Sequence, residues 1–217
     1  SGGTTATPVI SLPGNYTLTV TSLANGCTAS AVATVTTDTA PPIILTTAPP
    51  TLTCAIKQVS LNGTVSQPAN NFSSVWTTAN GHFVSGQNTL MPIVDAPGLY
   101  VLTVQNQQNG CTSTTTSTAT QNITPPVAEA GVTPTITCAQ TQVPLDGSSS
   151  TGAGALSFAW AGPQIVSGAN SAMPLVQAAG VYLVTVTDAA NGCTASDNVT
   201  VLQNTLPPTV AIAPPLL

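Results

Sequence analysis

Apolar residues alternate with threonine in three short segments, and this alternation is the strongest structural signal in the chain. The segments read YTLTV at 16–20, YVLTV at 100–104 and YLVTV at 182–186. A period of two places successive side chains on opposite faces of a strand, so each segment predicts a half-buried β-strand. No stretch of useful length shows the period of a helix.

An Asn-Gly-Cys-Thr sequence follows each of these strands, at 25–28, 109–112 and 191–194. Asn-Gly supplies positive backbone φ angles, so we expect a tight hairpin turn that leads into a second, threonine-rich strand. Pro-Pro pairs cannot continue a sheet ladder and predict stiff linkers; they stand at 41–42, 125–126 and 207–208. Short strands separated by Gly, Pro and Asn turns predict an all-β fold built as a β-sandwich.

The chain is internally repeated. Segments 1–16, 85–100 and 167–182 share the pattern SGxxxxxPxxxxxGxY at every fixed position. Tyr16, Tyr100 and Tyr182 are therefore 84 and 82 residues apart. Periodic self-similarity of this length indicates an array of structural units. We expect two complete repeats at 39–122 and 123–204, the C-terminal half of a repeat at 1–38, and the first strand of another at 205–217. The chain then reads as a window on a longer array.

Charge is almost absent, and this excludes several functions. Only 3% of the residues are charged, Lys57 is the single Lys or Arg, and the net charge is −5. Nothing in the sequence can neutralise a nucleic-acid backbone. No apolar run approaches the roughly 20 residues of a membrane-spanning helix, so no membrane span is expected. Regularly spaced cysteines with almost no lysine favour an oxidising, extracellular setting.

The second complete repeat carries a family resemblance. It reads PPVAEAG at 125–131, VPLDGSSSTGAGALSFAW at 143–160 and AAGVYLVTVTDAANGCTAS at 178–196. Taken together these motifs resemble the PKD-type immunoglobulin-like domain, in particular the repeats of large secreted surface adhesins of gliding Bacteroidetes. The resemblance covers essentially the whole chain, although the usual acidic turn after the tryptophan is replaced by WAGPQI at 160–165. It implies tandem immunoglobulin-like (PKD-like) β-sandwiches in an elongated array on the cell exterior.

The chain has five cysteines, so at least one has no partner within it. No two are close in sequence, whereas zinc sites usually begin with cysteines two to four residues apart, so disulfides are the better interpretation. One arrangement pairs Cys54 with Cys111 and Cys138 with Cys193 inside the repeats. It leaves Cys27 for a partner outside the chain.

The strand order implied by the resemblance favours a different pairing. In that order the segment ending at Cys54 lies at the exit end of a sandwich, and the Asn-Gly-Cys turn lies at the leading end. A strand of six residues spans about 20 Å, whereas bridged cysteines need Cα atoms within about 7 Å. The exit end of one repeat meets the leading end of the next, so we prefer an inter-repeat Cys54–Cys193 bond. Cys27 and Cys111 would then pair upstream and Cys138 downstream.

Most other distinctive residues have structural interpretations. Trp76 and Trp160 are expected in the sandwich cores rather than as ligand platforms, and the three repeat tyrosines are expected to form tyrosine corners. His82 has no Cys, Asp or Glu beside it in the sequence, and the acids are scattered, so no metal, cofactor or catalytic site is expected. The acids are Asp38, Asp95, Glu129, Asp146, Asp188 and Asp197. We expect a protein that is not an enzyme.

The hydroxyl-rich segment CTSTTTSTAT at 111–120 has two interpretations. It is an edge strand that packs threonine methyls inward, or it is O-glycosylated. Asp38-Thr39-Ala40 matches the acceptor pattern that the family resemblance implies, so Thr39 is a candidate O-glycan site.

Together these patterns predict a non-enzymatic extracellular stalk, adhesin or filament whose partners are neighbouring repeats of the same polypeptide. One alternative is a module that binds surface polysaccharide through Phe72, Phe83 and Trp76. Another is a fibre or sheath of laterally associated chains, because natural sheets guard their edges with lysine and this chain has almost none.

Overall fold

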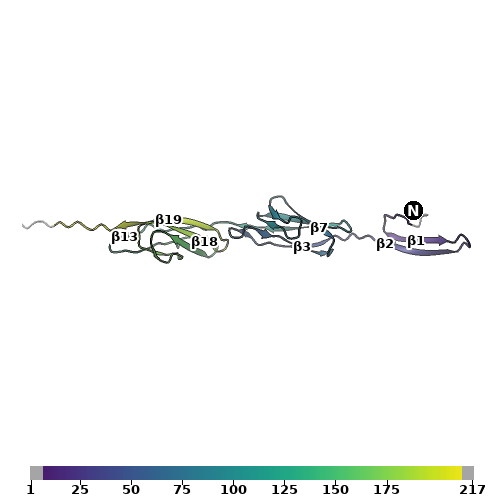
Figure 1. Cartoon of the computed structure of the whole chain (residues 1–217), viewed down its shortest axis with the longest axis horizontal. Helices are drawn as coiled ribbons and strands as arrows, with labels where there is room; N and C mark the ends of the chain where they lie inside the picture. The colour runs from purple at the N-terminus through teal and green to yellow at the C-terminus, as the bar shows by residue number, and fades with distance from the viewer. Residues whose placement is uncertain (1–6, 212–217) are drawn as a thin grey trace, which may run out of the picture.

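The computed structural model describes residues 7–211, and within that range every regular element is a β-strand. The strands form an N-terminal hairpin and two sandwiches that follow one another along a line (Figure 1). Residues 1–6 of the predicted half-repeat and 212–217 of the predicted last strand lie outside the described residues. No helix that could cross a membrane is found in the described part of the chain.

The N-terminal hairpin consists of β1 (Gly14–Thr21) and β2 (Thr28–Val35), paired antiparallel along their full length. Its alternation predicted a half-buried strand, but Leu18 and Val20 are 56% and 59% exposed. These side chains are exposed because β1 and β2 form a two-stranded sheet, and no other strand among residues 7–211 joins it.

The first sandwich contains β3 to β12. Its main sheet has the order β11-β10-β7, and smaller sheets β3-β6, β5-β9-β8 and β12-β4 complete it. The strand bounds are β3 Ile43–Thr47, β4 Leu52–Thr53, β5 Val59–Ser60, β6 Asn62–Gln67, β7 Phe72–Thr78, β8 Phe83–Ser85, β9 Ile93–Val94, β10 Gly98–Asn106, β11 Thr112–Ala119 and β12 Gln121–Asn122.

The second sandwich contains β13 to β19 and repeats this arrangement in two sheets, β13-β19-β18-β15 and β14-β17-β16. Its strands are β13 Thr135–Thr137, β14 Val143–Pro144, β15 Leu156–Ala161, β16 Ile165–Ser167, β17 Leu175–Val176, β18 Gly180–Asp188 and β19 Thr194–Asn204. Residues 205–211, predicted to begin a strand, form none. Strand geometry needs a hydrogen-bonded neighbour, and no strand of the described chain pairs with this segment.

Each sandwich has its own core, and the period of two explains which residues enter it. Along β10 the side chains of Tyr100, Leu102 and Val104 are fully buried, and Trp76 from β7 packs with them. In the second sandwich Trp160 is 6% exposed and lies in the equivalent core. The expectation that both tryptophans are core residues is therefore confirmed.

The threonine-rich strand β11 is an edge of its hydrogen-bonded sheet, but its outer side is not bare. Thr46 of β3 donates its hydroxyl to the Thr116 carbonyl at 2.8 Å, and Ser113 donates to the Pro42 carbonyl at 2.7 Å. Hydroxyl side chains thus connect β3 to β11 where a backbone ladder is missing. They protect this edge without lysine.

Candidate functional site: the junction between the sandwiches

One disulfide in the described chain joins the two sandwiches. Cys54 lies directly after β4 of the first sandwich and Cys193 directly before β19 of the second, with an S–S distance of 1.98 Å and a Cα–Cα distance of 5.0 Å. Cys27, Cys111 and Cys138 carry no disulfide in the structure. The bond therefore crosses between repeats, and the alternative Cys54–Cys111 and Cys138–Cys193 bonds are absent from the described chain.

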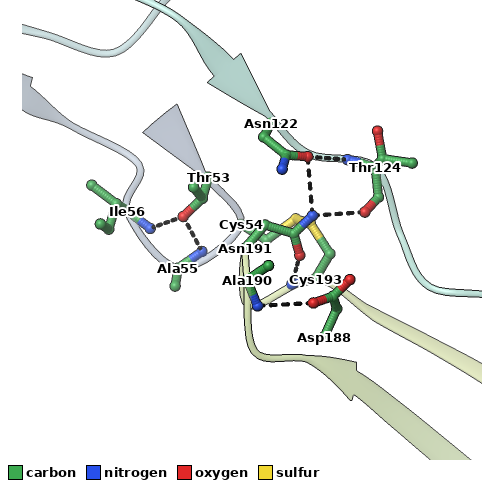
Figure 2. The surroundings of a disulfide bond; sticks show 10 residues. All are labelled: Thr53, Cys54, Ala55, Ile56, Asn122, Thr124, Asp188, Ala190, Asn191 and Cys193. Carbon is green, nitrogen blue, oxygen red and sulfur yellow. Dashed lines mark hydrogen bonds between the residues drawn. A yellow bond between two sulfur atoms is a disulfide. The ribbon is translucent and has the colours of Figure 1, made fainter. Parts of the chain in front are cut away.

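The turn that presents Cys54 is shaped by the threonine before it. The Thr53 hydroxyl oxygen accepts the N–H groups of Ala55 and Ile56 at 3.2 and 2.9 Å. The Thr53 N–H also donates to the Ile56 carbonyl at 2.8 Å. A short hydroxyl-containing side chain competes well for nearby backbone groups, which is why threonine favours such a turn. Cys54 stands at its tip (Figure 2).

The turn that presents Cys193 differs from the tight hairpin predicted for Asn-Gly. Its glycine has φ +70°, but Asn71 is the one described non-glycine residue with positive φ, so the turn asparagine is not left-handed. Asn191 instead accepts the Cys193 N–H with its side-chain oxygen at 2.9 Å. Asp188 and Cys193 close the loop through their backbone groups at 2.9 Å. The asparagine side chain therefore takes the place of a backbone acceptor inside this loop.

The side-chain amide of Asn191 also connects this turn to the linker between the sandwiches. It donates to the Thr124 carbonyl at 2.8 Å and to the Asn122 side-chain oxygen at 3.1 Å. The Ala55 N–H donates to the Asn191 carbonyl at 3.3 Å. Asn191 is 1% exposed, so these bonds lie inside the junction. Figure 2 shows the amide between the linker strand and the disulfide.

Asp188 holds the base of the same turn. This buried carboxylate accepts N–H groups from Ala190 at 2.8 Å, Ala153 at 2.6 Å and Gly154 at 3.0 Å. The pKa of Asp188 is lowered, chiefly by the hydrogen bond from the Ala190 N–H, while burial opposes the shift. No sequence pattern distinguishes this carboxylate from the other scattered acids. It is a structural anchor for the Asn-Gly-Cys turn.

The same linker contact recurs one repeat earlier. The Asn109 amide donates to the Ala40 carbonyl at 3.0 Å, and Asn109 accepts the Cys111 N–H at 2.9 Å. Gly110 has φ +77°, close to the value of its counterpart Gly192. The junction contact of the asparagine was missed by sequence analysis, which treated Asn only as a turn former. Its exact recurrence at 25, 109 and 191 was the available signal.

The repeat tyrosines form the predicted corners. Tyr16, Tyr100 and Tyr182 donate their hydroxyls to the carbonyl four residues earlier, at 2.7, 2.7 and 2.8 Å. Tyr100 also accepts the His82 N–H at 3.0 Å, and burial raises the pKa of Tyr100.

The remaining predicted residues lie apart from the junction. His82 does have an acid beside it, because Asp95 approaches its Nδ1 to 2.6 Å, which the sequence spacing of 13 residues concealed. The pair is exposed, and no group of three or more His, Cys, Asp or Glu that could hold a metal occurs among residues 7–211. Thr39 is exposed in the first linker, and its glycan stays a prediction.

A shallow groove of about 570 Å³ crosses the outer face of the first sandwich near one end of β7 and β10. Its lining includes Phe72, Ser73, Val75, Thr103 and Gln105, and it contains no charged side chain. Of the aromatic residues proposed as a polysaccharide platform, Phe72 lines this groove. Trp76 is buried, and Phe83 packs edge-on against Tyr100 at 5.2 Å.

No family model matches the chain, and no curated protein matches it. Among solved structures, the PKD domain from KIAA 1837 protein is 27% identical over 39% of this chain and 91% of that one, with a TM-score of 0.33. Sidekick-1 immunoglobulin domains 1–5 are 13% identical over 88% of this chain and 46% of that one, with a TM-score of 0.36. Three N-terminal domains of the bacteriophage RB49 outer capsid protein Hoc are 18% identical over 75% and 58%, with a TM-score of 0.42.

At these TM-scores the likenesses carry no argument about function. The fold is established by the strand topology and the two separate cores. The chain is all-β and consists of tandem immunoglobulin-like sandwiches. The alternation and the turn residues predicted the sandwich, and the family resemblance predicted its immunoglobulin-like, tandem form.

Proposed function

We propose that this chain is a non-enzymatic segment of an extracellular stalk, adhesin or filament, in which consecutive sandwiches are fixed end to end. The observation that carries the proposal is the Cys54–Cys193 disulfide between the two sandwiches. A disulfide inside one domain would stabilise that domain and leave the linker free to bend. A disulfide across the junction restrains the linker instead.

The polar contacts of the junction support the same role. Asn191 adds two hydrogen bonds to the linker and accepts a third from the neighbouring sandwich. Linked domains are expected to move relative to one another unless the interface between them is large and hydrophobic. Here a covalent bond and a buried amide supply the restraint that a large apolar interface would otherwise give. The disulfide also supports an oxidising location outside the cytosol.

Small-angle X-ray scattering tests the restraint directly. The oxidised chain is compared with a Cys54→Ser/Cys193→Ser double variant and with Asn191→Ala. We expect the oxidised chain to keep one extended pair-distance distribution. The double variant is expected to show a broader one with shorter mean dimensions. Cys111→Ser is the matched control, because that cysteine occupies the equivalent turn and carries no disulfide. Equal scattering from all four proteins would contradict the proposal that the disulfide and the Asn191 amide restrain the junction.

The extracellular location has its own test. Brief protease treatment of intact source cells should remove this segment from the cell-associated protein, while a cytosolic marker stays intact. Protection of the segment until the cells are lysed would count against a surface role.

A second candidate function, binding of surface polysaccharide, is favoured by the uncharged groove. Hydroxyl and amide side chains beside one aromatic ring suit a neutral sugar, which offers hydroxyl groups and an apolar face. Affinity electrophoresis in gels containing hydroxyethyl cellulose or dextran tests it. Retardation of the chain that is lost in Gln105→Ala would support this function, and unchanged mobility in every gel would exclude these polymers as ligands.

A further inference from the structure

The exit end of the second sandwich reproduces the turn that holds Cys54. The Gln140 N–H donates to the Thr137 hydroxyl at 3.0 Å, and the Thr137 N–H donates to the Gln140 carbonyl at 3.0 Å. The corresponding bonds of Thr53 are 2.9 and 2.8 Å. Parallel pairing of β13 with β19 likewise matches that of β4 with β12. Cys138 therefore occupies the position of Cys54, but it is exposed and carries no disulfide.

The acceptors that surround the existing disulfide also have counterparts at this end. Asn191 binds the side chain of Asn122 and the carbonyl of Thr124. The 82-residue step places Asn204 and Leu206 at the equivalent positions, and both are exposed. We call Cys138, Asn204 and Leu206 the exit-end surface. These residues correspond to Cys54, Asn122 and Thr124 of the junction between the sandwiches. At that junction the 191–193 turn contacts them, and at the exit-end surface no turn of the described chain does.

We propose that the exit-end surface binds the Asn-Gly-Cys turn of a further module and forms a disulfide with it through Cys138. The turn's asparagine amide would donate to the Leu206 carbonyl and the Asn204 side-chain oxygen. This inference rests on the proposed function, since it extends the same junction to the next unit. Two observations together support it. Cys138 carries no disulfide, whereas Cys54, at the equivalent position of the equivalent turn, forms one with Cys193.

The chain contains a turn of the required kind. Asn25 accepts the Cys27 N–H at 3.1 Å, and Gly26 has φ +73°, so this turn has the geometry of the one at 191–193. Its three residues are exposed. The turn at Cys111 is less suitable, because its asparagine amide is already bound to the linker at Ala40. A second copy of this chain can therefore supply the turn through Cys27, and so can another module of the same polypeptide.

The bond between them forms by ordinary thiol–disulfide exchange. Two thiols and one molecule of oxidised glutathione give one protein disulfide and two molecules of reduced glutathione, with a mixed disulfide between the two steps. The hairpin that bears Cys27 and strand β13 beside Cys138 lie at opposite ends of the elongated chain (Figure 1). A Cys27–Cys138 bond must therefore join two molecules.

The experiment uses the 217-residue chain in a glutathione redox buffer, with peptide mapping by thermolysin and mass spectrometry without reduction. Unselective oxidation of two thiols gives the mixed Cys27–Cys138 peptide at about twice the amount of either symmetric peptide. We expect the mixed peptide to exceed each symmetric one by at least tenfold, in a head-to-tail series of oligomers. Asn25→Ala should lower that preference several-fold, whereas Asn198→Ala, on an exposed position of β19, should not.

A statistical mixture of the Cys27–Cys27, Cys138–Cys138 and Cys27–Cys138 peptides, or no intermolecular bond at Cys138, would overturn a second copy of this chain as the donor. The same map reports the Cys54–Cys193 peptide, and its presence would leave the proposed function standing. Absence of the Cys54–Cys193 peptide would instead overturn the proposed function.

Protein isolated from its source under alkylating conditions separates the two possible donors. Cys138 linked to an Asn-Gly-Cys peptide of different sequence identifies another module of the same polypeptide. Cys138 linked to the Cys27 peptide identifies a second copy. A fully alkylated Cys138 thiol in that protein would overturn the proposal for either donor.

Discussion

The junction disulfide should change how far the chain extends under force, and the structure fixes the size of the change. Cys54 and Cys193 are 139 residues apart in sequence. At about 3.5 Å per residue the enclosed chain has a contour length of about 490 Å. A pull on the two termini of the oxidised protein cannot extend that segment, even when both sandwiches unfold. The load passes from Cys54 directly to Cys193.

The perturbation is Cys193→Ser, and the assay is single-molecule force spectroscopy with handles at the termini. The 217 residues of the variant allow about 760 Å of extended chain, whereas removing the 139 enclosed residues leaves 78 and about 270 Å. Oxidised wild type should therefore stop near the shorter value and reach the longer one after reduction. Cys111→Ser should behave as the wild type. Release of the full contour by an oxidised chain whose thiol count shows the bond intact would refute the reasoning.

Three further predictions concern the stability of the turns and of the tyrosine corners. Gly192→Ala should lower the free energy of unfolding in urea more than Gly110→Ala. Both glycines have positive φ, but only a Cβ at 192 would lie 2.6 Å from the side chain of Ala55 across the junction. Asp188→Asn should make the free energy of unfolding less sensitive to acid. The pKa of Asp188 is lowered in the folded state, so its carboxylate stabilises the fold above the unfolded pKa of 3.8, and this stabilisation is lost as the pH falls from 3.8 through the folded-state pKa. Tyr100→Phe should lower the free energy of unfolding by about 1 kcal/mol more than Tyr182→Phe, because it also removes the acceptor of the His82 N–H. Equal urea midpoints for the two variants would contradict this.

The strands and the cores could be predicted because they depend on a local pattern. In β10 the alternation places Tyr100, Leu102 and Val104 on one face, and that face is fully buried. The same pattern in β1 predicted burial for Leu18 and Val20, which are mainly exposed. Alternation shows which side chains share a face, but it does not show whether another layer covers that face.

The site was harder to predict because it depends on groups that are distant in sequence. The Asn191 amide binds a carbonyl 67 residues away, and no local pattern marks Thr124 as its acceptor. Asp188 looked like one scattered acid among six, although three backbone N–H groups surround its carboxylate. The Asn-Gly pair predicted a tight hairpin turn from the positive φ angles that both residues tolerate. The asparagine side chain accepts a backbone N–H within the loop, and the contact of its amide with the linker appears only where the sandwiches meet.

The order of the cysteines gives a repeating junction a mechanical property that a single disulfide lacks. Cys138 precedes Cys193 by 55 residues, so a bond from Cys138 to a further module would close a loop that overlaps the Cys54–Cys193 loop. The shortest covalent path along such an array would enter this repeat through the disulfide at Cys193. It would follow the backbone from Cys193 back to Cys138 and pass through the Cys138 disulfide to the next repeat. It uses 55 residues in each repeat where the uncrosslinked chain uses 82, so unfolding every sandwich would still leave the array about one third shorter. The overlap would also place residues 138–193 of this repeat inside both loops, so breaking one disulfide would leave the other to limit the extension.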